Sequence, residues 1–411
     1  MDVNQNLVIL GGGLTGHAAA MAARGHGFEG GITIVSAEEH RPYDRTPLSK
    51  AVLQGQREPD DLYFMSDEDY AEHDITCRTG ANAVGVDFDK KIIELDQRDS
   101  LTWDTLLIAT GCDPIRLDNP GFDLPGVHYL RRISDAVQLR DAIDQASRVL
   151  VIGASFIGSE VAASARVRGA DVVLVDRLDH PMQAALGDEI GSLCASIHQD
   201  HGVDLRMGTT VTELRGTDRV ERAVFDDGTE LDCDLVVVGV GVRPNVELFD
   251  ASKLEIENGI LVDEYCRTSI PGVYAAGDVA NWWHPEREQR IRIEHFDNAG
   301  SQGTFAGKVI AGASEEPFAP VPFFWSDQYD TNIQFVGFPT ENMELIIRGN
   351  PDDREVTGFY IDEGGITAAV TVNHPRNLRS VRRLVRARAK IDSETLKDPE
   401  TDLRALSREY S

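Results

Sequence analysis

The sequence has 411 residues, of which 41% are hydrophobic and 27% charged, and its formal net charge is −29. This length predicts two or three domains, and the acidity argues against general nucleic-acid binding because phosphate contacts need a basic surface. No apolar run reaches the about 18 residues that a membrane helix requires, and the amino terminus has no basic region or cleavage site typical of a secretion signal. We therefore expect a cytoplasmic protein that binds neither a membrane nor nucleic acid.

Five cysteines are scattered singly along the chain, with no CxxC and no short paired spacing: Cys77, Cys112, Cys194, Cys233 and Cys266. This pattern predicts isolated reduced thiols of a cytosolic protein rather than a disulfide framework. The sequence also lacks HExxH, a nucleophile elbow and any cluster with metal-ligand spacing. We expect no metal site.

The first segment with a chemical signature is LVILGGGLTGHAAAMAARG, residues 7–25. It predicts a buried strand, a glycine turn and an alanine-rich helix, with Gly11, Gly13 and Gly16 forming GxGxxG. In a dinucleotide fold these glycines provide a tight turn, room for pyrophosphate and close helix packing. A lone GxGxxG is weak evidence, but the flanking strand and helix strengthen it.

A proline-broken loop follows in HRPYDRTPLSKAVL, residues 40–53. Thr46 is a good N-cap and Pro47 a good first helical residue, so Lys50 is expected in the first turn of a helix. A cation there lies near the positive end of the helix dipole and mildly costs stability. A functional site that needs a positive charge explains this placement.

The dinucleotide pattern recurs in RVLVIGASFIGSEVAASARVRGADVVLVD, residues 148–176, with Gly153, Ser155 and Gly158 as GxSxxG. The predicted strand VVLV ends at Asp176, where an acid can accept hydrogen bonds from an adenosine ribose, which favours NADH over NADPH. Arg177 beside it can bind a 2′-phosphate, so the preference stays open.

Aligning the two units places Ser36 opposite Asp176, and the acid that follows, Glu38, becomes the expected ribose ligand of the first unit. The alternative is that both repeats are Rossmann-like but only one binds a nucleotide.

Three later segments also combine strand-like runs with glycines: LLIATG at 106–111, LVVVGVGVRPN at 235–245 and TSIPGVYAAGDVA at 268–280. Small residues after a strand let a cofactor approach the backbone, and Asp278 can accept hydrogen bonds from a polyol hydroxyl. Each segment alone is also compatible with an ordinary turn. Their order along the chain is the stronger signal.

Trp325 lies in VPFFWSDQYD, residues 321–330. The aromatic cluster is too dense for a typical surface loop, and Ser326 and Asp327 interrupt it too much for a core strand. An indole can stack on a flavin or nicotinamide face. Core packing is the alternative.

From about residue 323 the chain changes character, with strand-like runs such as MELIIRG and GITAAVTVN before a basic segment. Residues 376–390 contain seven basic side chains and no acid. Leu378, Val381 and Val385 share one helical stripe, so the arginines project away from it. Either they form a solvated face or they dock an acidic protein.

The order of these motifs resembles the two-dinucleotide-binding flavoproteins that include glutathione reductase, in which the first unit holds FAD and the second NAD(P)H. Disulfide-reducing members carry a CxxxxC pair after the first unit, where this sequence has PYDRTPLSK. Together with FFWSDQYD and RIEHFDNA, residues 323–330 and 292–299, this stretch is similar to the NADH-dependent ferredoxin reductases of bacterial oxygenase systems, of the putidaredoxin, rhodocoxin and biphenyl dioxygenase ferredoxin reductase type.

The resemblance implies residue roles. Lys50 is expected beside the N5 edge of the flavin, paired with Glu160, and Trp325 over the nicotinamide side of the isoalloxazine. The expected FAD residues are Gly11, Gly13, Thr15, Gly16, Glu38, Arg45, Lys50, Thr110, Gly111, Arg131, Asp278, Val279 and Phe296. The expected NAD residues are Gly153, Ser155, Phe156, Ile157, Gly158, Glu160, Asp176, Gly239 and Val240. The sequence departs from the family pattern at Thr46 (usually proline), Ser155 (usually glycine) and Phe296 (usually tryptophan).

The implied fold is α/β, with two Rossmann-like dinucleotide-binding domains, for FAD and NAD, and a carboxyl-terminal α+β domain. The expected boundaries are 1–113 and 247–322 for FAD, 114–246 for NAD and 323–411 for the third domain. The FAD domain is discontinuous because AAGDVA, which is assigned to FAD, follows the whole second unit.

The implied function is electron transfer from NADH through FAD to a [2Fe–2S] ferredoxin that supplies a cytochrome P450 or Rieske-type oxygenase. The ferredoxin is expected to dock on Arg379, Arg382, Arg383 and Arg386. One alternative is an NADH oxidase or quinone reductase on the same scaffold. Another is a nucleotide-sensing or interaction protein with a structural flavin, like relatives of apoptosis-inducing factor.

Overall fold

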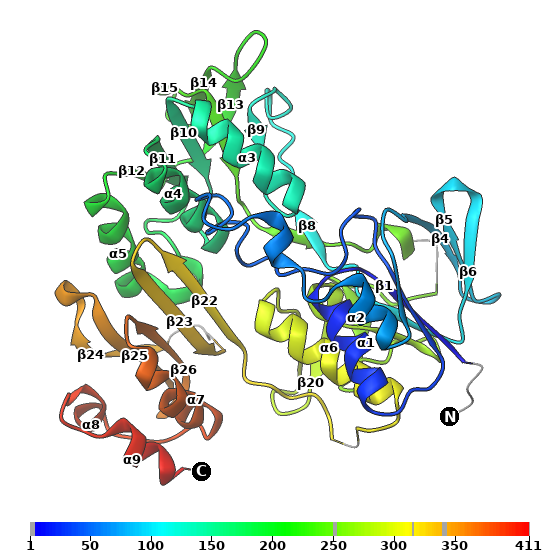
Figure 1. Ribbon diagram of the computed structural model, residues 1–411. Coiled ribbons are helices and arrows are strands. Elements are labelled where there is room, and N and C mark those ends of the chain that lie inside the picture. Colours follow the sequence, from blue (N-terminus) through cyan, green and yellow to red (C-terminus); the bar gives the residue numbers. More distant parts are fainter. Residues whose placement is uncertain (1–4, 250–252, 315, 339–342, 411) are drawn as a thin grey trace. The chain divides into compact units, whose positions relative to one another are not determined.

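The computed structural model describes residues 5–249, 253–314, 316–338 and 343–410. The chain forms two compact units, each assembled from three separate segments (Figure 1). Unit 1 comprises Met1–Asp44, Pro59–Asp113 and Val242–Pro320, and unit 2 comprises Arg45–Glu58, Pro114–Gly241 and Val321–Ser411.

Unit 1 is built on a parallel sheet of five strands in the order β19-β7-β1-β2-β3. Its strands are β1 (Asn6–Leu10), β2 (Gly31–Val35), β3 (Ile75–Arg78), β7 (Thr105–Ile108) and β19 (Val273–Ala275). In the central strand β1 the apolar residues that follow Asn6 are all buried. A parallel strand covered on both faces needs such a continuous apolar run, which is why β1 reads LVIL rather than alternating.

Smaller elements complete unit 1. Its minor sheets contain β4 (Ala83–Asp87), β5 (Ile92–Leu95) and β6 (Asp99–Thr102); β18 (Ile260–Val262), β20 (Ala280–His284) and β21 (Gln289–Ile291); and the pair β8 (Cys112–Pro114) and β17 (Val242–Pro244). Its helices are α1 (Leu14–Gly25), α2 (Asp67–Glu72) and α6 (Phe296–Ile310), with 3₁₀ helices at Pro59–Leu62, Asp96–Arg98, Glu247–Phe249 and Gly277–Val279.

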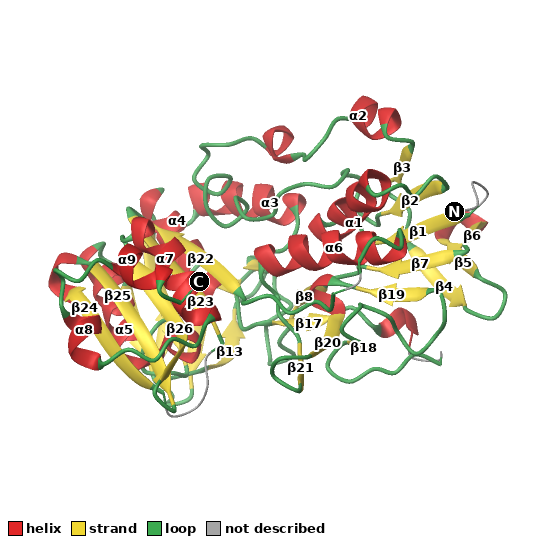
Figure 2. Cartoon of the chain, turned by 90° about the horizontal axis from the view of Figure 1, so that it is seen from below, coloured by secondary structure: helices red, strands yellow, loops and turns green. Residues whose placement is uncertain are grey.

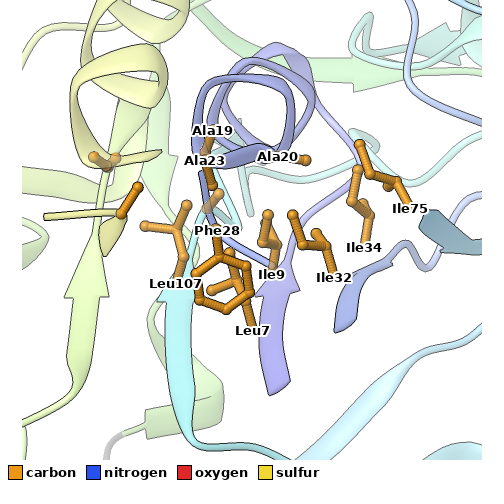
Figure 3. Close-up of a cluster of buried hydrophobic side chains, with 14 of the residues drawn as sticks. Leu7, Ile9, Ala19, Ala20, Ala23, Phe28, Ile32, Ile34, Ile75 and Leu107 are labelled. Atoms are coloured by element: carbon orange, nitrogen blue, oxygen red, sulfur yellow. The ribbon is translucent and has the colours of Figure 1, made fainter. Parts of the chain in front are cut away.

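Helices α1 and α6 lie side by side in unit 1 (Figure 2). Their close approach requires glycine, because a Cβ on Gly307 would lie 2.3 Å from the carbonyl oxygen of Ala19. On its other side α1 turns small side chains, such as Ala19 and Ala23, toward the sheet residues Ile9 and Ile32 (Figure 3). Small residues on both faces thus let α1 lie close to the sheet and to α6 at once.

Unit 2 contains a second parallel sheet, in the order β12-β11-β10-β16-β9. Its strands are β9 (Val127–His128), β10 (Arg148–Ile152), β11 (Asp171–Asp176), β12 (Asp204–Met207) and β16 (Leu235–Val238). The accompanying helices are α3 (Ile133–Gln145), α4 (Phe156–Val167) and α5 (Gln183–Asp200), and a small antiparallel sheet contains β13 (Val211–Arg215), β14 (Arg222–Phe225) and β15 (Glu230–Asp232).

The carboxyl-terminal part of unit 2 is an antiparallel sheet in the order β22-β23-β26-β25-β24, with short helices after it. Its strands are β22 (Phe323–Gln328), β23 (Thr331–Gly337), β24 (Glu344–Asn350), β25 (Glu355–Asp362) and β26 (Gly365–Val372). The helices are α7 (Leu378–Arg386), α8 (Ser393–Lys397) and α9 (Leu403–Arg408), with 3₁₀ helices at Pro351–Asp353 and Pro375–Asn377. Val381 and Val385 of α7 are buried against this sheet, as their helical spacing predicts.

The predicted fold class is confirmed: two parallel α/β sheets and a carboxyl-terminal αβ part. The predicted three-domain boundaries remain a prediction beside the two compact units. In the described part of the chain no helix combines the length and apolarity needed to cross a membrane.

Two local predictions are wrong. The segment after Thr46 is a series of turns rather than a helix. The N–H groups of Lys50 and Val52 both donate to Pro47 O, which lies three and five residues earlier, whereas in an α-helix the acceptor lies four residues earlier. The FFWSDQ stretch, which is predicted to be too interrupted for a core strand, is β22, with every second residue buried. In both cases polar contacts to α4, described below, outweigh the local propensity.

Candidate functional site

The glycine loop of unit 1 joins β1 to α1, and two of its glycines are fixed by backbone contacts. Gly11 has φ +130°, and a Cβ there would lie 2.0 Å from the Ala109 carbonyl oxygen. A Cβ on Gly16 would lie 2.1 Å from the carbonyl oxygen of Gly11. Gly13 differs, because its Cβ would meet no atom of the described residues within 4 Å. The loop is therefore packed on one side and open at its middle position.

Gly13 is also the N-cap of α1 and offers no side chain to the first-turn N–H groups. Uncapped N–H groups at the positive end of a helix dipole are a ready site for a phosphate. The open middle position and the uncapped helix start together fit the pyrophosphate of a dinucleotide.

A second glycine turn lies against the start of α1. A Cβ on Gly277 would lie 2.3 Å from Thr15 Oγ1, and Gly277 N donates to Gln302 Oε1 of α6 at 2.8 Å. Thr15 Oγ1 in turn donates to Ala299 O at 3.1 Å. These contacts hold the buried Asp278, next in the chain, close to the glycine loop.

The remaining predicted flavin residues of unit 1 follow the ends of its strands. The Cys112 thiol donates to Asp278 Oδ2 at 3.1 Å, and Thr110 Oγ1 donates to Asn245 O at 2.9 Å. Glu38, shortly after β2, accepts a hydrogen bond from Tyr43 OH at 2.7 Å. Gly111 has φ +70°, Val279 is fully buried and Phe296 begins α6.

The glycine loop of unit 2 repeats this geometry between β10 and α4. Gly153 has φ +99°, and a Cβ added there would lie 2.4 Å from the Gly239 carbonyl oxygen. A Cβ added to Gly158 would lie 1.7 Å from the carbonyl oxygen of Gly153. Ser155 at the middle position is exposed and is the N-cap of α4, but its hydroxyl donates to Gly239 O at 3.4 Å instead of capping the helix. Serine at this position therefore still leaves the helix start open.

The carboxylate of Asp176 supports this loop. Oδ2 accepts from Ala154 N at 2.6 Å and Oδ1 accepts from Leu178 N at 2.9 Å. Each carboxylate oxygen has a further lone pair, so the acid can still accept hydrogen bonds from a ribose. Arg177 beside it is exposed.

Two large apolar side chains next to this loop are exposed, Ile157 at 44% and Val240 at 37%. Exposed apolar residues beside a phosphate-binding loop suit the flat ring of a nucleotide. Phe156 is covered instead, with its ring 4.3 Å from that of Phe324 in an edge-on contact.

A buried carboxylate, Glu160 of α4, joins three segments of unit 2. Lys50 Nζ lies 3.5 Å from Oε1, and Ser326 Oγ of β22 donates to the same oxygen at 2.8 Å. Ser49 Oγ donates to Oε2. Glu160 therefore has one cationic and two hydroxyl partners, which satisfies a carboxylate that is only 5% exposed.

Opposing effects act on the pKa of Glu160. Burial raises it, and this is the largest effect, while the Lys50 ammonium and then the hydrogen bonds from Ser49 and Ser326 lower it. The carboxylate of Asp327 raises it further. The net effect raises the pKa of Glu160, so its protonated form is favoured more than it would be in water.

Lys50 itself has further neighbours. Its Nζ lies 3.7 Å from Asp327 Oδ2 and 5.6 Å from the ring centroid of Trp325. Trp325 is half-buried and stacks on Phe323, with ring centroids 6.0 Å apart. The three predicted catalytic residues, Lys50, Glu160 and Trp325, thus form one cluster within unit 2.

The segment that carries Lys50 is held by two further contacts. Ser164 Oγ of α4 donates to Ser49 O at 2.7 Å, and Gln54 Nε2 donates to Ser164 Oγ at 3.1 Å. Nearby, Arg45 Nη1 donates to Arg131 O at 2.8 Å, so these two predicted flavin residues also contact each other. Tertiary bonds to α4 explain why the segment forms turns rather than a regular helix.

The sequence interpretation missed several partners in both units: Ser49, Gln302, Asn245 and, as a hydrogen-bond donor, Ser326. Alternation was the one available signal, because in β22 Phe324, Ser326 and Gln328 occupy the buried face. Polar residues at core-facing positions of a strand indicate a buried polar partner.

Known proteins match this chain over nearly its full length. Residues 5–303 match the pyridine nucleotide-disulphide oxidoreductase family, and residues 323–407 match the reductase C-terminal family. Rhodocoxin reductase of Rhodococcus erythropolis is 35% identical over 400 residues, which are 97% of this chain and 93% of that protein.

Two solved structures are also similar. The ferredoxin reductase for the CYP199A2 system from Rhodopseudomonas palustris gives a TM-score of 0.95 at 32% identity and covers 98% of this chain and 100% of that one. The reductase of the covalent putidaredoxin reductase–putidaredoxin complex gives 0.94 at 30% identity, covering 100% and 99%.

Proposed function

The chain belongs to the pyridine nucleotide-disulphide oxidoreductase family, and on that premise we propose that it transfers electrons from NADH through FAD to a [2Fe–2S] ferredoxin. The observation that carries this proposal is the pair of glycine loops, one in each unit, each leading into a helix start without a capping hydrogen bond. Two such loops call for two dinucleotides. The acceptor is inferred from the similar structure that is named as a ferredoxin reductase.

FAD, when bound, supplies the chemistry that links a two-electron donor to a one-electron acceptor. In unit 1 we assign its pyrophosphate to the N–H groups after Gly13, its ribose to Glu38 and its polyol chain to Asp278. The fit rests on the open position at Gly13 and on the buried carboxylate of Asp278 beside the loop. The contacts of Thr15 with Gly277 and with Ala299 O hold the glycine loop and Asp278 close together.

The remaining assignments follow the family. For FAD they are Gly11, Gly16, Arg45, Lys50, Thr110, Gly111, Arg131, Val279 and Phe296. For NADH they are Gly153, Ser155, Phe156, Ile157, Gly158, Glu160, Asp176, Gly239 and Val240. Asp176 with its remaining lone pairs favours an unmodified adenosine ribose, hence NADH.

We assign Lys50 the role of a fixed cation for the flavin ring and Trp325 that of covering its nicotinamide side. A positive charge stabilises the electron-rich ring, and two unit charges about 4 Å apart interact by roughly 4 kcal/mol at an effective dielectric of about 20. Glu160 gives this ammonium a partner. Hydrogen bonds from Ser49 and Ser326 to the carboxylate offset part of the effect of its burial.

The ferredoxin is proposed to dock on α7 and to pass its electrons to a cytochrome P450 or Rieske-type oxygenase. Arg379 and Arg386 are exposed, and Arg383 is half-buried. Arg382 lies with its guanidinium carbon 4.3 Å from the ring centroid of Phe323. An arginine face on a chain of charge −29 favours an acidic partner.

We also propose a cytoplasmic location. Burial raises the pKa of the thiols of Cys77, Cys194, Cys233 and Cys266, so these cysteines stay protonated and slow to oxidise. Single buried thiols of this kind are typical of proteins from reducing compartments.

The test is a steady-state assay of NADH oxidation with an acidic [2Fe–2S] ferredoxin, and separately with oxygen or a quinone alone. The proposal predicts turnover that depends on the ferredoxin. Equally fast NADH consumption without it would instead identify an oxidase or quinone reductase.

A further inference from the structure

A groove in the carboxyl-terminal part of unit 2 gathers an unusual number of cations. It encloses about 580 Å³, between α7, the start of α9 and β24. Its charged lining consists of one carboxylate, Asp402, and six arginines: Arg348, Arg376, Arg379, Arg383, Arg404 and Arg408. Arginine stays protonated at any ordinary pH, so the groove is strongly positive on a protein of net charge −29.

Most of these arginines lack a counter-charge. Within the described residues, Arg376, Arg379, Arg383 and Arg404 form no ion pair with a carboxylate within 4.0 Å. By contrast, Arg215 and Arg222 of the same unit both pair with Glu230. Within the described residues these four arginines therefore repel one another without an ion-pair partner of their own.

The other charged groups of the groove are already engaged. Asp402 Oδ1 accepts from Arg404 N at 2.8 Å and Ala405 N at 3.1 Å, as the N-cap of α9. Arg348 Nη2 donates to Pro399 O and to Thr401 O, both at 2.7 Å. The Arg348 guanidinium is thus held in place by backbone carbonyls, and the carboxylates of Asp398 and Glu400 also attract it electrostatically.

The start of α7 faces the same groove, since Asn377, Arg379 and Ser380 all line it. Its first turn contains no acidic residue, and the N-cap side chain makes no capping bond; Asn377 Nδ2 donates instead to Thr357 Oγ1 at 3.1 Å. Arginines at the positive end of a helix are unfavourable unless an anion lies between them.

We infer that this groove is a binding site for a small oligophosphate, a ligand with two or more linked phosphate groups. Guanidinium groups bind phosphate oxygens in pairs, and a linked phosphate chain matches several arginines at once. The volume falls in the range of about 300–1,000 Å³ typical of small-molecule sites. A single phosphate would leave most of the four arginines that form no ion pair without a phosphate partner.

This site overlaps the proposed ferredoxin surface at Arg379 and Arg383 but is not identical to it. Arg376 and Arg404 line the groove but are not among the docking residues, whereas Arg386 is a docking residue that does not line the groove. Variants at these positions therefore separate the two functions.

The test is calorimetric titration of the FAD-loaded full-length protein, freed of unbound nucleotide, with tripolyphosphate at constant ionic strength. The R376Q/R404Q double variant is compared with wild type, and R386Q is the matched control on α7. We expect one-to-one binding to wild type and R386Q, and at least about tenfold weaker binding to R376Q/R404Q, because it loses charge-assisted hydrogen bonds.

Two further arms identify the ligand class. Sulfate and hexaglutamate, tested at the same ionic strength, are expected to bind far more weakly than tripolyphosphate. Equal binding of hexaglutamate, absence of tripolyphosphate binding, or equal affinity in R376Q/R404Q would overturn the inference.

A second measurement needs no variant. Tripolyphosphate should protect Arg376 and Arg404, but not Arg386, from modification by phenylglyoxal, as mapped by mass spectrometry. Uniform modification with and without tripolyphosphate would likewise contradict the site.

Discussion

Ser326 Oγ donates to Oε1 of Glu160 across 2.8 Å, to the same oxygen that faces Lys50 Nζ at 3.5 Å. The two residues are 166 positions apart in the chain. One carboxylate oxygen thus links β22, α4 and the segment that carries Lys50. The proposed cation and its support form a single unit, and the first two predictions concern that unit.

Replacing Lys50 with methionine should both slow electron delivery and destabilise unit 2. Lys50 is 17% exposed and Glu160 5%, and breaking a buried pair from one side costs about 3–5 kcal/mol because a charge stays behind unpaired. The double variant Lys50→Met/Glu160→Gln should lose less stability than the sum of the single losses. Urea denaturation of all four proteins measures this.

The matched control is Lys253→Met. Lys253 Nζ pairs with Asp89 at 2.9 Å, but both side chains are more than 70% exposed. Loss of that exposed pair should leave both the free energy of unfolding and electron transfer nearly unchanged. If both lysine variants behave alike, Lys50 has no special role.

The pKa of Glu160 predicts how its substitution depends on pH. Burial raises this pKa above the ordinary value of 4.5, so the contribution of Glu160 to stability is fully present below pH 4.5 and is lost as pH rises through the folded pKa. Glutamine does not titrate. The stability of Glu160→Gln relative to wild type should therefore improve as pH rises from 4.5 and level off above the folded pKa. Denaturation curves at a series of pH values check this, and a pH-independent difference would refute it.

The two glycines of the first loop should fail in different ways. Gly16→Ala brings a Cβ to 2.1 Å from a backbone oxygen, so it should lower the melting temperature even before cofactor is considered. In Gly13→Ala the new methyl group meets no atom of the described residues within 4 Å, and φ at this position, −88°, is one that alanine readily adopts. This variant should fold with near-normal stability but bind flavin weakly.

Melting curves and the flavin-to-protein absorbance ratio distinguish these outcomes. A Gly13→Ala protein that keeps a full complement of FAD would mean that the loop does not bind the pyrophosphate.

The arginine face of α7 predicts that ferredoxin reduction depends on salt. Arg386→Gln should lower the second-order rate constant with ferredoxin by about twofold at low ionic strength, and less at high, because exposed charges act mainly on association. Lys90→Gln, which breaks the exposed pair with Asp87 and carries the same charge change, is the control. Stopped-flow rates at several salt concentrations provide the measurement. A rate independent of salt in the unmodified protein would exclude electrostatic docking on this helix.

Much of the fold follows from local sequence. The glycine loops could be predicted because their constraint is local: Gly11 and Gly153 adopt positive φ, and Gly16 and Gly158 pack their Cα against the loop carbonyl five residues earlier. The apolar runs of β1 and β10 are equally legible, since a covered parallel strand tolerates no polar alternation.

The support of the Lys50 cluster was less predictable. Serine is common and carries no periodic signal, and Ser49 and Ser326 acquire their roles only when the fold brings them to Glu160. The same contacts explain the two local errors. Bonds from Ser164 and to Glu160 hold the Lys50 segment in turns, and the partner for Ser326 lets a polar residue occupy the buried face of β22.

The most direct test of the account is an anaerobic titration of the purified protein, first with NADH and then with an oxidised [2Fe–2S] ferredoxin, followed by visible absorbance. The account predicts that one equivalent of NADH bleaches a bound flavin and that two equivalents of ferredoxin then restore its colour while the iron–sulfur absorbance falls. A protein that binds no flavin, or whose flavin NADH cannot bleach, would contradict it.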